Sequence, residues 1–107
     1  MKKEIKIYDV LKSKVADDQL KGDAVFNAVL SEVEVSKHNK GESNIEIILD
    51  FKDIELINTA FLNNAIGKLF DKSQYNINEH KVFIKDMDEH VIDLLKEVIS
   101  SARKKYI

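Results

Sequence analysis

The chain has 107 residues, 17 Lys and Arg against 19 Asp and Glu, a formal net charge of -2, and neither Cys nor Pro. This length predicts one domain over residues 1–107, with a radius of gyration of about 13 Å. The absence of Cys excludes disulfides, Cys-ligated zinc, iron–sulfur clusters and a Cys nucleophile, and suits a reducing cytosol. The near-neutral charge argues against nucleic acid as a partner, because phosphate binding usually requires a concentrated basic surface.

Apolar runs are short throughout the chain. The longest purely aliphatic run covers residues 47–49, whereas a membrane-spanning helix needs about 20 apolar residues. Lys6, Asp9 and Lys12 interrupt the N-terminal segment, so no apolar signal-peptide core forms there. We therefore expect a cytoplasmic protein that does not bind membranes and that is a monomer in isolation.

The first half of the chain predicts a strand and then a helix. Residues 4–10 begin with alternating apolar and polar side chains, which is typical of a strand with one face or edge in water. A polar connection over residues 12–21 leads to Asp23, a good N-cap for a helix over residues 24–37. The apolar stripe of that helix contains Val25, Phe26, Val29, Leu30 and Val33. Residues 37–44 then have the composition of a loop.

The middle of the chain repeats this order. Residues 45–51 are nearly continuous in β-forming side chains, as expected of a central strand covered on both faces. A connection through Asp53 and Glu55 leads to a second helix that begins near Thr59. Its apolar positions are Phe61, Leu62, Ala65, Ile66, Leu69 and Phe70.

The last third predicts one more strand and the clearest amphipathic helix. After a loop over residues 73–79, residues 81–85 bracket a short apolar strand. Asp86, followed three residues later by Glu89, is the signature of a helix start. The apolar side chains of that helix are Val91, Leu94, Leu95, Val98, Ile99 and Ala102.

The predicted element order is therefore β-α-β-α-β-α, which favours an α/β fold with a mainly parallel sheet packed against helices. Ligand and partner sites in such sheets lie beyond the carboxyl ends of the strands. The rule predicts that a ligand or partner site lies within residues 52–64, which follow the central strand.

Residues 47–62 read IILDFKDIELINTAFL. This segment resembles the signature of STAS domains, the fold of anti-sigma factor antagonists. It is more similar still to the bacterial STAS-like family of unknown function, whose members carry a Leu-Asp-Phe strand end and then a helix start with a small residue and Phe. That family is often fused to, or encoded with, histidine-kinase-like ATPases. The resemblance implies a STAS-like fold and an ATPase partner.

The resemblance also implies one candidate modification site. In the antagonists the helix opens with an acidic residue, a phosphorylatable Ser, a small residue and Gly, and Thr59 stands at the position of that Ser. A phosphate on Thr59 would add about -1.5 to -2 charges at the positive end of a helix dipole. The alternative reading is structural: the Thr59 hydroxyl caps the helix, with Asn58 competing for the same role.

Polar residues around this helix start form a candidate partner-binding surface. They are Asp53, Glu55, Asn58, Thr59, Asn63 and Asn64, with Asn63 and Asn64 expected to point outward. Partners recognise such surfaces through complementary charge.

Other side-chain patterns give weaker signals. Five side chains crowd the last helix start: Asp86, Asp88, Glu89, His90 and Asp93. They could bind a divalent ion, but the spacing fits no EF-hand loop, and the helix dipole favours acids in a first turn anyway. The histidines, His38, His80 and His90, have no metal-binding spacing, and we expect them to be exposed. We expect no metal and no cofactor.

Catalytic motifs are missing from the sequence as well. The three Gly lie far apart, and no Ser stands in a nucleophile elbow. The sequence therefore predicts a non-catalytic cytoplasmic signalling domain that docks a protein, with Thr59 as the candidate switch. The alternative hypothesis is a module that senses a small ligand or nucleotide in the crevice at the strand ends.

Overall fold

Two parallel sheets form the strand layer of the protein. The computed structural model describes residues 2–41 and 44–106. The larger sheet has the strand order β1–β3–β5, formed by β1 (Lys2–Lys6), β3 (Glu46–Asp50) and β5 (Val82–Lys85). The smaller sheet pairs β2 (Val15–Ala16) with β4 (Leu56–Ile57), also in parallel. The predicted α/β fold with parallel strands is confirmed.

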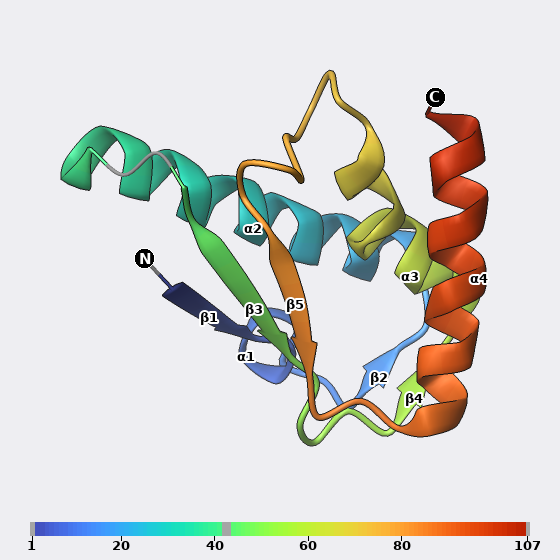
Figure 1. Ribbon diagram of the computed structural model, residues 1–107. Coiled ribbons are helices and arrows are strands. Elements are labelled where there is room, and N and C mark those ends of the chain that lie inside the picture. The colour runs from blue at the N-terminus through green and yellow to red at the C-terminus, as the bar shows by residue number, and fades with distance from the viewer. Residues whose placement is uncertain (1, 42–43, 107) are drawn as a thin grey trace.

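Helices alternate with the strands of the larger sheet, as predicted. They are α1 (Ile7–Leu11), α2 (Gln19–Lys40), α3 (Thr59–Ala65), the single-turn 3-10 helix η1 (Gly67–Phe70) and α4 (Glu89–Lys105). Figure 1 shows α2 crossing the sheet and α4 standing beside α3. The radius of gyration is 13.1 Å, in agreement with the expected value. The short elements α1, β2 and β4 were not predicted.

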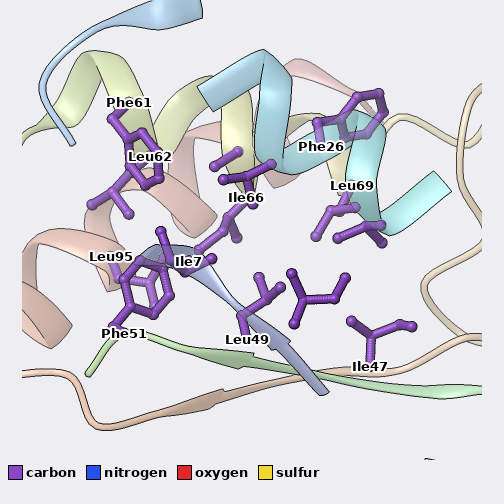
Figure 2. Packing of buried hydrophobic residues seen from close by; sticks show 14 of the residues in the cluster. Ile7, Phe26, Ile47, Leu49, Phe51, Phe61, Leu62, Ile66, Leu69 and Leu95 are labelled. Carbon is purple, nitrogen blue, oxygen red and sulfur yellow. The ribbon is translucent and has the colours of Figure 1, made fainter. Parts of the chain in front are cut away.

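The core lies between the larger sheet and the helices. In Figure 2 the side chains of Ile47, Leu49 and Phe51 point from the sheet toward those of α2 and α3. Phe61, Leu62 and Leu69 are fully buried on the helix side. The apolar faces of the helices and of the strands thus pack against each other in one core. Burial of these side chains is the main favourable contribution to folding.

The opposite face of the larger sheet is open. Ile48 of β3 is only half-buried, and its register neighbour Phe83 on β5 is 46% exposed. The prediction that residues 45–51 are covered on both faces is therefore wrong. Helices cover one face only, and a nearly continuous apolar run did not distinguish the two arrangements.

The predicted strand over residues 4–10 is too long. β1 ends at Lys6, and the chain turns into α1, which keeps Ile7 fully buried. Lys12 ends α1 in the left-handed region with φ 54°, and its N–H donates to the Tyr8 carbonyl at 2.7 Å. The loss of apolar alternation after Ile7 therefore marks the change from strand to helix.

The predicted limits of α2 also need correction. Asp18, not Asp23, is the N-cap, and its carboxylate accepts a hydrogen bond from the Lys21 N–H at 2.7 Å. At the other end the helix continues to Lys40, and Gly41 stops it with φ 66°, a conformation that favours Gly. The predicted loop over residues 37–44 is therefore shorter, and its residues 42–43 lie outside the described residues.

His80 is buried, contrary to the expectation of an exposed imidazole. It is 3% exposed, and its Nδ1 accepts a hydrogen bond from the Ile45 N–H at 3.3 Å. The Tyr75 hydroxyl donates to the His80 carbonyl at 2.6 Å. These contacts join the segment before β5 to the start of β3, a pairing that the sequence around His80 does not reveal.

Burial of His80 predicts acid sensitivity of the fold. Desolvation lowers the pKa of His80, the nearby Glu79 carboxylate raises it, and Lys37 lowers it, so the pKa lies below its ordinary value. The unfolded chain then binds more protons near pH 6, and His80 contributes stability that is present above about pH 6.5 and lost as the pH falls.

Urea unfolding across this pH window tests the prediction. The free energy of unfolding should fall between pH 7.5 and 5.5, and His80→Asn, which keeps an acceptor without the titration, should flatten that slope. His38→Asn is the matched control, because His38 is exposed. An unchanged slope in His80→Asn would contradict the assignment. The two pH values, 7.5 and 5.5, lie on either side of the ordinary pKa of a histidine side chain, which is about 6.5.

Candidate functional site

The segment with the family signature begins at the end of β3. Leu49 and Phe51 are buried in the core, whereas Asp50 accepts a hydrogen bond from the Lys52 N–H at 2.9 Å. Burial would raise the pKa of Asp50, but the Lys52 N–H and the Lys85 ammonium favour its charged form, so the pKa lies below its ordinary value. The Leu-Asp-Phe sequence thus ends the strand, anchors two core side chains and fixes the turn that follows.

A crevice of about 490 Å³ lies beyond the carboxyl ends of β3 and β5. Four carboxylates line it, those of Asp53, Glu55, Asp86 and Asp88, and Lys52 is the single cation among its lining residues. Asp53 and Asp86 adopt φ 70° and 57°, in the left-handed region that few non-Gly residues enter. The crevice is therefore acidic, and two of its acids sit on tightly turned loops.

The predicted start of α4 at Asp86 is wrong by two residues. Asp88 is the N-cap, although its side chain makes no capping hydrogen bond, and Glu89 lies in the first turn. Within residues 2–41 and 44–106, no group of three carboxylates or imidazoles could hold a metal ion. Acids at this helix start are explained by the favourable charge–dipole interaction.

Asn58 caps α3 and also ties it to the first half of the chain. Its Oδ1 accepts a hydrogen bond from the Phe61 N–H at 3.0 Å, and its Nδ2 donates to the Asp17 carbonyl at 2.8 Å. Thr59 is the first residue of α3, so the alternative reading of its hydroxyl as the cap is wrong. The Thr59 side chain is exposed, and its hydroxyl makes no hydrogen bond to the described part of the chain.

The two asparagines that follow differ from one another. Asn63 is exposed, as expected. Asn64 is half-buried, contrary to expectation, and its Nδ2 donates to the Asp23 carboxylate at 3.0 Å. Lys68 contacts the same carboxylate at 2.6 Å and holds the pKa of Asp23 below its ordinary value. Asp23 therefore lies inside α2, five residues after its N-cap, and joins this helix to α3 and η1.

The six predicted partner-binding residues do not converge on one cleft. Asp53 and Glu55 line the acidic crevice, whereas Asn63 and Asn64 line a separate groove of about 310 Å³. All six lie within residues 53–64, a segment in which Phe61 and Leu62 are buried. Segment 14–19 runs beside this segment, since β2 pairs with β4 and the Asn64 amide reaches the Gln19 carbonyl at 3.3 Å.

Two exposed leucines belong to the same surface and were missed from the sequence. Leu56 in β4 is 52% exposed, and Leu20 in the first turn of α2 is 79% exposed. We call the exposed residues of segments 17–20 and 53–63 the helix-start surface. The only sequence signal for Leu20 was its place as an apolar residue in a mostly polar connection, where Val15 and Ala16 are apolar as well.

The family assignment rests on a segment that contains residues 53–63 of this surface but not residues 17–20. Residues 28–91 match the family described as STAS-like domain of unknown function. The chain belongs to this family. No curated protein and no solved structure matched the chain. The match spans the sequence from α2 to the start of α4 and includes the Leu-Asp-Phe strand end and α3.

The STAS-like domain thus presents a mixed surface beside α3. Its exposed side chains offer carboxylates, one hydroxyl and apolar area. Among the described residues, none of the helices has both the length and the apolar character required to cross a bilayer.

Proposed function

We propose that this STAS-like domain is a non-catalytic, cytoplasmic signalling domain that docks a histidine-kinase-like ATPase through the helix-start surface and is a monomer when free. The observation that carries the proposal is the exposure of Leu56 in a strip with Asp53 and Glu55. Protein interfaces combine an apolar centre with a polar rim. The family signature over residues 47–62 supports the choice of partner class.

Charge defines what the partner should present. Asp17, Asp18, Asp53 and Glu55 are exposed on the helix-start surface. A partner that offers an apolar pocket for Leu56 and basic side chains around it would be complementary, and opposite charges of this kind accelerate association and fix orientation. Asn58 and Asn64 act as positioning residues, because their amides hold the two segments together.

Thr59 is the proposed switch. Its hydroxyl is exposed within the same surface and is not needed for the cap, which Asn58 supplies. A phosphate would place about -1.5 to -2 charges and added bulk in the contact area, and burying such a group against the apolar part of the interface costs desolvation free energy. Phosphorylation by the docked ATPase would then release the complex.

Intact mass spectrometry tests the switch after incubation with ATP and the histidine-kinase-like ATPase encoded nearest to this chain. Thr59 is the only threonine in the sequence, so phosphothreonine identifies the site. We expect one phosphate on the wild type and on Thr59→Ser, and none on Thr59→Val. A phosphate that persists in Thr59→Val, or none on the wild type, would contradict the proposed switch.

The alternative hypothesis, a small-ligand or nucleotide sensor at the strand ends, receives less support. The crevice there has four carboxylates and one lysine among its lining residues. Phosphate groups would meet like charges, which disfavours a nucleotide at this position.

A further inference from the structure

A second hollow lies away from the strand-end crevice, near the other end of the strands of the larger sheet. Figure 1 shows the segment between η1 and β5 beside the C-terminal turns of α4, away from the arrowheads of β3 and β5. A cavity of about 610 Å³ lies between these two parts. We call it the loop–helix pocket, and its volume is in the range of small-molecule sites.

The charge of the loop–helix pocket is opposite to that of the strand-end crevice. Lys72 and Arg103 line it, and no carboxylate does. Among the described residues, no carboxylate lies within ion-pair distance of either cation. Two cations without a counter-ion at one cavity favour a ligand that carries negative charge.

Aromatic side chains form much of the remaining lining, namely Phe70, Tyr75 and Tyr106. The Arg103 guanidinium lies over the Phe70 ring, 5.7 Å from its centroid. A guanidinium that rests on a ring is oriented by it, and its N–H groups lie at its edge, where they can donate in pairs to a carboxylate or phosphate. The ring contact thus positions Arg103 as an anion-binding group.

The wall of the pocket is held by its own hydrogen bonds. Tyr75 is 5% exposed, and its hydroxyl donates to the His80 carbonyl at 2.6 Å. The Asn76 Oδ1 accepts hydrogen bonds from the Asn78 and Glu79 N–H groups, both at 3.2 Å. A wall that is already ordered loses little conformational entropy on binding.

We propose that the loop–helix pocket binds a small planar aromatic anion, with Arg103 and Lys72 holding the carboxylate or phosphate and the aromatic lining holding the ring. This site is distinct from the strand-end crevice, with which it shares no lining residue, and the proposal does not depend on the proposed docking function.

Naphthalene derivatives test both parts of this recognition by NMR titration of the isotope-labelled protein. We expect naphthaleneacetate to bind with a dissociation constant of about 1 mM or tighter and to shift amides of residues 70–78 and 103–106. Its neutral amide, naphthaleneacetamide, and acetate alone should each bind about tenfold more weakly. Naphthyl phosphate is the second anion, and tighter binding of one of the two anions assigns carboxylate or phosphate as the preferred group.

Charge-removing variants locate the site. Arg103→Gln should weaken naphthaleneacetate binding about tenfold or more. Lys104→Gln, which removes the same charge from the neighbouring exposed position outside this pocket, should leave it unchanged. Spectra of the free variants report whether each still folds. Equal binding of the acid and its amide, shifts confined to other residues, or equal weakening by both variants would overturn the proposal.

Discussion

Phe61→Ala should lower the free energy of unfolding by about 3–5 kcal/mol, a large part of the roughly 5–15 kcal/mol of a typical domain. Phe61 is fully buried in the first turn of α3, and its ring packs edge-on against Phe51 with centroids 6.4 Å apart. Truncation would leave a cavity between α3 and the end of β3 and would remove that aromatic contact. Urea unfolding followed by circular dichroism measures the loss.

Phe83→Ala is the matched control for this prediction. Phe83 lies on the open face of the sheet and is 46% exposed, so its truncation should cost about 1 kcal/mol or less. A similar loss of unfolding free energy in Phe61→Ala and Phe83→Ala would contradict a core that lies on only one face of the larger sheet. Phe61, at the helix start of the signature segment, is thus a core residue, whereas Thr59 two positions earlier is exposed.

Gly22→Ala should destabilise the protein by about 2 kcal/mol, although Ala is the better helix former. A Cβ atom at Gly22 would lie 2.5 Å from the Phe61 carbonyl oxygen and 3.0 Å from the Ala65 nitrogen. These are backbone atoms of α3, so the two helices would have to separate, and such overpacking costs about 3 kcal/mol. Helix propensity would return only about 1 kcal/mol.

Gly67→Ala is the control that shows whether replacing a Gly by Ala is destabilising in general or only where two helices lie close together. A Cβ atom at Gly67 would meet its nearest atom, Val98 Cγ1, at 3.7 Å, an ordinary contact. For Gly67→Ala we expect the free energy of unfolding to fall by at most about 0.5 kcal/mol, or to rise. If Gly22→Ala proved as stable as the wild type, the close contact between α2 and α3 would be wrong.

Elements with many periodic positions were predictable from the sequence. The apolar stripe through Val25, Val29 and Val33 predicts the body of α2, because 3.6-residue periodicity requires a buried helix face. The three strands of the larger sheet are likewise marked by β-forming runs. β2 and β4 have two residues each, and no period can be detected over two positions.

Tertiary contacts decided the features that local patterns left ambiguous. Asp18 and Asp23 both carry a side chain suited to an N-cap, and in the structure Asp18 caps α2 whereas Asp23 lies inside the helix and bonds to Asn64 and Lys68. His80 has a polar neighbourhood in the sequence, yet the N–H of Ile45 makes it a core residue. Such pairings join residues far apart in the chain and leave no local signal.

The exposure of several candidate site residues could be predicted from the sequence, but their grouping could not. Asp53, Glu55, Thr59 and Asn63 are exposed, yet only Asp53 and Glu55 line the crevice at the carboxyl ends of the strands. Leu56 was not predicted, because its exposure follows from the short pairing of β4 with β2. The loop–helix pocket was also missed, since Arg103 reads simply as a basic residue at the end of a helix.

An ATPase that docks on the helix-start surface, as proposed, should change the amide signals of that surface. NMR titration of the isotope-labelled chain with the histidine-kinase-like ATPase encoded nearest to it tests this directly. We predict that the largest changes in amide signals fall in residues 17–20 and 53–63. Changes centred on the open face around Phe83, or no change at all, would contradict the proposed docking.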